Sequence, residues 1–202
     1  MEMPKIQLSS AEKELMKNAD VILTKNTVLK KIKLLLEQVQ QEQVRFIIDQ
    51  KLGTTDPFLI FPKISRGENY EGLPYIILDY PRMTMNHHFF LARTMFWWGH
   101  HFSSTLHLSG NYKKRYKENI KASYQQLSEF YICINSDQWI HHFEETNFIR
   151  IGSLSEKQFA EQCDAFEHIK ISFKCPLDNW EEDPYKLLAK WKLLIELCGL
   201  IS

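Results

Sequence analysis

The sequence has few cysteines and no excess of charge. Its 202 residues include 4 cysteines, and 25 basic side chains balance 25 acidic ones. The closest two cysteines, Cys163 and Cys175, are twelve positions apart, which fits neither a zinc ribbon nor a compact disulfide framework. A chain of this length buries roughly 70% of its unfolded surface, so it needs neither disulfides nor a metal to fold. We therefore expect four reduced thiols, no metal and no cofactor.

Two further absences disfavour whole classes of function. Without a basic excess, the chain lacks the charge that neutralises phosphates, so dedicated nucleic-acid binding is disfavoured. No stretch approaches the ~20 apolar residues of a membrane-spanning helix. The segment from Met1 to Leu8 contains no apolar core of a signal peptide. We expect a cytoplasmic protein that binds neither nucleic acid nor membrane.

Apolar residues recur with helical spacing at both ends of the chain and near its centre. Capping boxes begin at Ser9 and Ser155, Thr27 can cap a second helix, and Asp183 with Pro184 can begin the last one. The polar stretch 40–43 can mark a break. The expected helices are 9–23, 27–48, 111–131, 155–166 and 183–197.

Between these helices the spacing changes to the period of two that is typical of strands. Residues 65–72 are expected as a polar loop, and Pro81 as the end of a strand. Short connections favour an antiparallel meander over about residues 58–108, with further short strands in 131–151 and 169–174. The expected strands are 58–64, 73–80, 89–98, 101–108, 132–134, 139–143, 148–151 and 169–173. The predicted fold is α+β, one domain over residues 1–202 whose sheet packs against N-terminal, central and C-terminal helices.

The aromatic-rich hairpin from Phe89 to Leu108 is the most distinctive segment. A loop of two or four residues pairs Trp97 with Phe102, whereas a loop of three shifts the pairing by one and brings Arg93 beside His107. This polar face is either solvated or the lining of a ligand cleft. Four polar residues share one face of the second strand in either register: His101, Ser103, Thr105 and His107.

Arg93 is the residue of this hairpin whose partner matters most. Its neighbours on its own face, Leu91 and Met95, are apolar, and a buried guanidinium needs a partner. The candidates are Asp79 on the preceding strand and the carboxylate or phosphate of a ligand. The histidines of the hairpin predict no metal site, because six residues of strand separate them by about 20 Å.

Two basic segments are weaker candidates. The predicted loop 63–72 combines two glycines with Arg66 but lacks a phosphate-cradle motif. Lys113, Lys114, Arg115 and Lys117 fall in the first turns of a helix, where positive charge opposes the helix dipole. This cluster is either an anion-binding rim or a solvated basic face.

Three central segments resemble part of an uncharacterised bacterial family of hypothetical proteins. They are Gly72–Arg82, Arg93–Gly99 and Thr105–Gly110, with the sequences GLPYIILDYPR, RTMFWWG and TLHLSG. The resemblance covers a small part of the chain. It implies no activity and no site residues.

Two hypotheses for the function follow. The first is a non-catalytic binding or scaffold protein that uses its aromatic-rich sheet to bind a protein partner or a second copy of itself. The alternative is a small-molecule enzyme or ligand carrier with a pocket for an anionic ligand. No nucleophile motif assigns a catalytic residue. The candidate ligand-binding residues are Arg66, Arg82, Arg93, His101 and His107.

Overall fold

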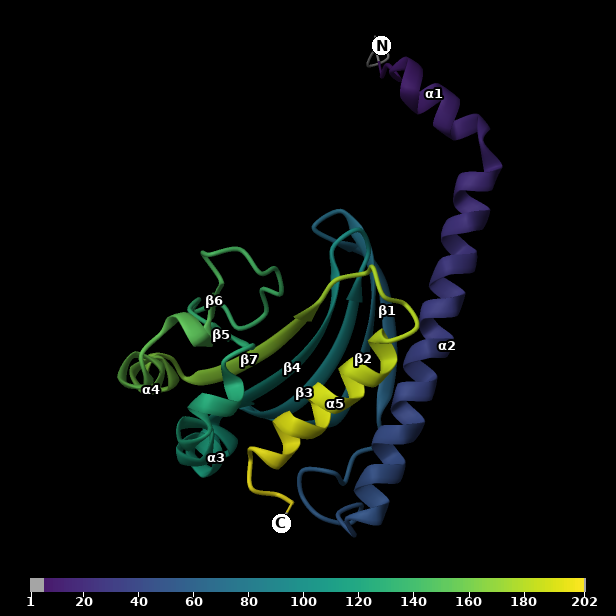
Figure 1. The fold of residues 1–202 in the computed structure, drawn as a ribbon. Helices are drawn as coiled ribbons and strands as arrows, with labels where there is room; N and C mark the ends of the chain where they lie inside the picture. The colour runs from purple at the N-terminus through teal and green to yellow at the C-terminus, as the bar shows by residue number, and fades with distance from the viewer. Residues whose placement is uncertain (1–5, 202) are drawn as a thin grey trace.

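The computed structural model describes residues 6–201, which form five α-helices and one seven-stranded antiparallel sheet (Figure 1). The strands lie in the order β1-β2-β3-β4-β7-β5-β6. None of these helices has both the length and the apolar character that crossing a membrane requires. The helices are α1 (Ser10–Lys17), α2 (Ala19–Asp49), α3 (Gly110–Ala122), α4 (Glu156–Ala165) and α5 (Asp183–Glu196), with short 3₁₀ helices at Tyr124–Leu127 and Ile151–Ser153. The strands are β1 (Lys63–Tyr70), β2 (Leu73–Met85), β3 (His88–Trp97), β4 (His101–Ser109), β5 (Tyr131–Cys133), β6 (Phe148–Arg150) and β7 (His168–Cys175).

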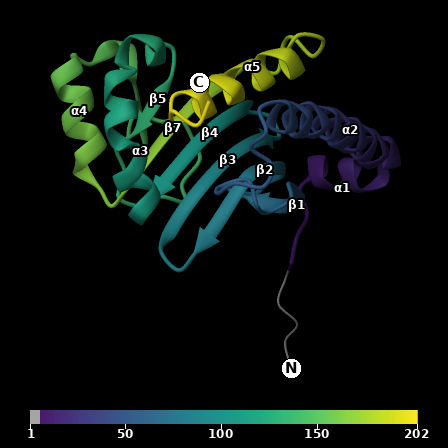
Figure 2. The ribbon, with the colours of Figure 1, turned by 90° about the horizontal axis from the view of Figure 1, so that it is seen from below.

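The predicted α+β class is confirmed, and the helices gather on one face of the sheet (Figure 2). Trp191 of α5 is fully buried, stacks on Tyr80 at 6.2 Å between ring centroids, and donates its indole N–H to the Tyr80 carbonyl. Phe46 of α2 meets the same indole edge-on. One aromatic side chain therefore joins α2, α5 and β2, and its N–H has the partner that a buried polar group requires.

β4 lies in the middle of the sheet and is buried along its whole length. On the helix-covered face, its side chains Leu106 and Leu108 belong to the main hydrophobic core. The opposite face of β4 carries polar side chains that are also buried. Burial on both faces places polar groups in the interior, where each of them needs a hydrogen-bond partner.

Two predictions about the edge of the sheet were wrong. The strand expected at 58–64 is absent over residues 58–62, and β1 at 63–70 takes most of the place of the expected loop 65–72, because pairing with β2 supplies hydrogen bonds that the polar composition does not reveal. Gly67 fits this strand because a Cβ there would lie 2.4 Å from the ring of Tyr75. β2 continues past Pro81, which lies where the register shifts between Asp79 and Arg82. A proline is tolerated at such an irregularity because no ladder hydrogen bond is lost there.

The N-terminal helices also differ from the prediction. The break between them falls at Asn18, whose side chain accepts a hydrogen bond from the backbone N–H of Asp20. Thr27 does not cap a helix; its hydroxyl donates to the Leu23 carbonyl inside α2. α2 is 31 residues long and continues unbroken through the polar stretch 40–43. Burial of one apolar face along the sheet holds this long helix together.

Three further predictions differ in detail. The central helix ends at Ala122 rather than near Tyr131, and a 3₁₀ turn follows it. Residues 139–143 do not form a strand but belong to the irregular connection between β5 and β6. Asp183 does not cap α5; its carboxylate is buried and accepts from the Cys175 thiol at 3.1 Å. The predicted reduced thiols are confirmed, since all four cysteines are free and buried.

The packing of α2 can be tested with two neighbouring isoleucines. Ile47 is fully buried against the core, whereas Ile48 is 63% exposed. Ile47→Ala should lower the free energy of unfolding by about 2–5 kcal/mol because it leaves a cavity. The matched change Ile48→Ala should stay within about 0.5 kcal/mol. Urea denaturation of both variants measures the difference, and equal losses would contradict this placement of α2.

A buried polar face on the sheet

The face of the sheet opposite the helices carries the candidate site, and we call it the polar face. The loop between β3 and β4 has three residues, so Trp97 pairs with His101 and Arg93 with Thr105. This is the register that places Arg93 and His107 on one face, on adjacent strands. The polar face combines side chains from four strands: Asp79, Arg93, His101, Ser103, Thr105, His107, Lys170 and Ser172.

Arg93 finds the partner that the sequence suggested. Its guanidinium binds Asp79 with two parallel hydrogen bonds, Nε to Oδ1 at 2.8 Å and Nη2 to Oδ2 at 3.0 Å. Its Nη1 lies 3.2 Å from Nε2 of His141. Because a guanidinium can only donate, His141 accepts through Nε2 and its ring is neutral. Both side chains of the ion pair are 17% exposed, so the pair lies at the rim of the buried region.

Residues 134–147, which we call the β5–β6 segment, lie across the polar face. Gln138 accepts from Nε2 of His107 at 2.9 Å, and its backbone carbonyl accepts from Nζ of Lys170 at 3.1 Å. Lys170 also donates to the carbonyl of Ile140. The backbone N–H of His141 donates to the Tyr70 hydroxyl at 2.7 Å. Polar contacts therefore hold a segment without regular secondary structure against the sheet.

Lys170 is an unusual residue for an interior. It is 1% exposed, and burial lowers the pKa of its ammonium to about 8, with nearby Arg93 acting in the same direction. Its ammonium forms no ion pair with a carboxylate of residues 6–201, and Asp137 acts on it only at longer range. The ring of Phe148 lies 5.3 Å away. Two backbone carbonyls and an aromatic ring thus stabilise a positive charge.

The histidines of the polar face are neutral at physiological pH. Burial, together with the charges of Lys170 and His168, lowers the pKa of His107 to about 3. Burial, Lys170 and Arg93 also hold the pKa of His141 well below its usual range. His101 has a pKa lowered to about 4, again mainly by burial. Charging any of these rings would require water that the folded protein excludes.

The five candidate residues do not converge on one site. Arg93 and His107 lie together beneath the β5–β6 segment, and His101 lies on the same face but against the ring of Phe143. Arg66 is exposed and pairs with Ile76, which places it on the helix-covered face. Arg82 donates its Nε–H to the Phe61 carbonyl at 2.6 Å. Two of the five candidates, Arg93 and His107, therefore belong to the site, and His101 lies elsewhere on the same face.

The sequence interpretation missed three residues that complete the site. Lys170 alternates with Ile169 and Ile171 in a strand, so the period of two would have placed it on the opposite face. His141 and Gln138 come from an irregular connection, for which no local pattern predicts a position over the sheet.

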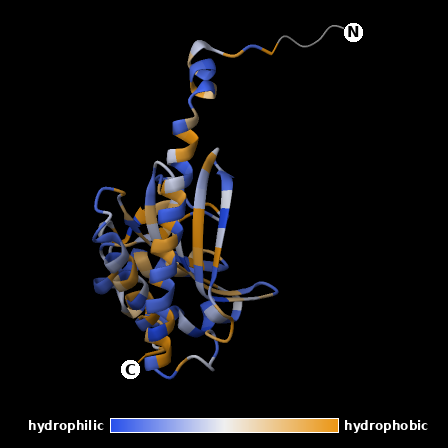
Figure 3. Ribbon diagram, turned by 90° about the vertical axis from the view of Figure 1, so that its right-hand side faces the viewer, coloured by the Kyte–Doolittle hydropathy of each residue, from blue (hydrophilic) through white to orange (hydrophobic). Residues whose placement is uncertain are grey.

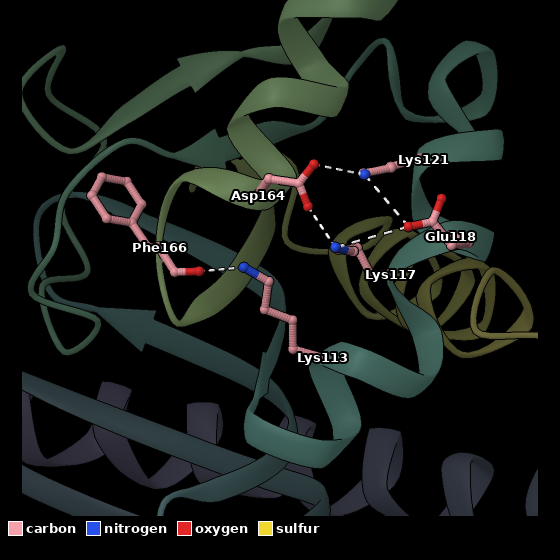
Figure 4. A network of polar contacts seen from close by, with 6 residues as sticks. All are labelled: Lys113, Lys117, Glu118, Lys121, Asp164 and Phe166. Atoms are coloured by element: carbon pink, nitrogen blue, oxygen red, sulfur yellow. Dashed lines mark hydrogen bonds and ion pairs between the residues drawn. The ribbon is translucent and has the colours of Figure 1, made fainter.

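The basic cluster at the start of α3 is not part of this site (Figure 4). Asp164 of α4 accepts from Lys117 at 2.6 Å and from Lys121 at 2.8 Å, which lowers the pKa of its carboxyl group to about 2. Lys113 donates to the Phe166 carbonyl. Lys113, Lys117 and Lys121 therefore join α3 to α4, whereas Lys114 and Arg115 of the predicted cluster are exposed to solvent.

No protein-family model, no curated protein and no solved structure matches this chain. The resemblance of its central segments to a bacterial family therefore stays a prediction. Any function has to be argued from the chemistry of the site rather than from the fold.

The neutral histidines predict a loss of stability in acid. An unfolded histidine takes up a proton near pH 6.5, whereas folded His107 does so only near its lowered pKa. Its contribution to stability is therefore fully present above about pH 6.5 and is lost as the pH falls toward the folded value. His107→Gln should make the decrease in unfolding free energy between about pH 7.5 and about pH 4.5 shallower.

Urea denaturation at several pH values measures this slope. His87→Gln, on the exposed turn between β2 and β3, is the matched control and should leave the slope unchanged. Parallel curves for the wild type and His107→Gln would contradict the lowered pKa, because they would show that His107 takes up its proton at the same pH in the folded and unfolded protein.

Proposed function

We propose that this protein is a non-catalytic binding protein that takes a small anionic molecule, a carboxylate or a phosphate, at the rim of the polar face. The observation that carries the proposal is that Arg93 and Lys170 lie on one face of the sheet, and that among the described residues only one carboxylate, Asp79, is in direct contact with either of them, through Arg93. The neutral histidines add hydrogen-bonding groups but no negative charge. The face therefore has an excess of positive charge, which a low-dielectric surrounding strengthens.

Arg93 has donors left for a ligand. Of its five N–H groups, two bind Asp79 and one faces His141. The remaining two belong to a side chain that is 17% exposed and so within reach of solvent. Tyr70 accepts from the backbone of His141 through its hydroxyl oxygen, which leaves its own O–H to donate. A carboxylate or phosphate at this rim would accept charge-assisted hydrogen bonds from Arg93.

Binding is better supported than catalysis. A general base works best when its pKa lies near the working pH, and the lowered pKa values of His107 and His141 remove them from that range. Lys170, whose pKa of about 8 lies within it, is 1% exposed and donates to two backbone carbonyls, so it is not accessible to a substrate. Trp97 is 2% exposed, so the aromatic hairpin serves as interior support for the site and not as its contact surface. The four buried, free thiols support a reducing compartment and hence a cytoplasmic location.

The ligand site is tested by titrating the full chain with citrate, benzoate, inorganic phosphate and adenosine monophosphate in isothermal calorimetry, with thermal denaturation alongside. At least one probe should bind and raise the melting temperature by mass action. Arg93→Gln should weaken that binding by about 10- to 100-fold because it removes a charged donor. Tyr70→Phe, which removes one hydroxyl, should weaken it by roughly 3- to 10-fold.

Arg45→Gln is the matched control, since Arg45 is exposed on α2 and pairs with Glu42. It should bind the probe as the wild type does. Loss of Arg93 also leaves Asp79 without its partner, so circular dichroism must first show that the variant is folded. If no probe binds, or if Tyr70→Phe and Arg93→Gln bind as tightly as Arg45→Gln, the proposed site is wrong.

A further inference from the structure

Exposed apolar side chains are concentrated along one edge of the molecule. Among the described residues, all the large exposed hydrophobic side chains except Met85 and Trp139 lie on or before α1, on α2, or on the segments 59–61 and 180–185 that flank α2. A surface on which such side chains are contiguous marks a contact with another molecule. This edge is separate from the polar face, which lies on the other side of the sheet.

The first part of this edge is an arm, which we define as residues 6–24. Every residue of the arm is exposed, and α1 has no buried residue. Figures 1 and 3 show the arm extending beyond the sheet, away from the rest of the chain. Leu15, Met16 and Ile22 are 58%, 71% and 56% exposed. An isolated helix of eight residues is marginal in water, so α1 gains most from a surface that covers it.

The second part is a groove of about 990 Å³ between α2 and α5. Leu34 and Trp180 line it and are 52% and 43% exposed, and Tyr185 and Leu188 extend the apolar lining. Charged side chains surround it: Lys31 and Glu42 from α2, and Glu181 from the turn before α5. The groove thus has an apolar floor and a charged rim, as helix-binding grooves do.

We infer that α1 of a second copy of this chain docks in the groove, so that two chains exchange their arms about a two-fold axis. The groove begins at Lys31, thirteen residues into α2 from the break at Asn18, or about 20 Å along the helix axis. Leu15 and Met16 precede that break by only two or three residues, within about 5 Å. These side chains therefore cannot reach the groove of their own chain.

Size and charge favour a second copy. α1 is about 12 Å long, and the stretch of α2 that lines the groove, residues 31–42, is about 18 Å long. The arm carries charges of both signs, as the rim does, so opposite charges can pair across the interface. The charged residues of the arm are Glu12, Lys13, Glu14, Lys17 and Asp20. A two-fold arrangement repeats each contact, which helps to reach the roughly 800 Å² per partner of a stable interface.

Light scattering during size-exclusion chromatography of the full chain tests the exchange. The wild type should have twice the mass of one chain, and Leu15→Glu on the arm and Leu34→Glu in the groove should each give monomers. Met85→Glu changes an exposed apolar residue outside this edge and should remain a dimer. Mixing the two monomeric variants should restore a dimer, because one intact arm and one intact groove remain. A monomeric wild type would overturn the proposal.

Cross-linking separates this arrangement from other dimers. A chain with both Met16→Cys and Leu34→Cys should form a covalent dimer under oxidising conditions, and the four native thiols are buried and do not interfere. Each single variant should stay largely uncross-linked. Efficient cross-linking of Met16→Cys alone would show that the arms pair with each other, and a double variant that does not cross-link would show that the groove is not the docking site.

Discussion

The structure depends on one constraint, which is that the central strand β4 is buried on both of its faces. One face meets the helices with apolar side chains, as an ordinary core requires. The other face carries histidines, serines and a threonine, and these need partners inside the protein. Thr105 meets Ser172 at 2.6 Å, and His107 meets Gln138. Nε2 of His101 has no hydrogen-bond partner among the described residues, so the network covers the part of the polar face around Thr105 and His107.

This constraint explains the position of the β5–β6 segment. Its backbone carbonyls and its Gln138 and His141 side chains supply the partners that the sheet itself lacks. Covering the face removes water, and the removal of water keeps the histidines neutral and lowers the pKa of Lys170. The same burial leaves Arg93 as the group through which the network meets solvent. Fold stability and the proposed ligand site thus depend on the same contacts.

Much of the fold and one part of the site could be predicted because their causes are local. The capping boxes at Ser9 and Ser155 form as their sequence pattern predicts. The partner of Arg93 was also predictable, since a buried guanidinium between apolar neighbours needs a carboxylate and Asp79 lies on the preceding strand. Lys170 lies within the strand that the alternation predicted, but its place in the site could not be predicted, because the alternation does not show which face of that strand is buried.

The sequence by itself determined the α+β class, which residues share a face along each strand of the hairpin, and the ends of several helices. These features follow from spacing and from neighbours within a few residues. Only the tertiary structure decided the register at Trp97, the continuation of β2 past Pro81 and the hydrogen bonds of Lys170 to the β5–β6 segment. These features arise from pairing between strands and from a connection folded back over the sheet. Such contacts join residues far apart in the chain, so no local pattern specifies them.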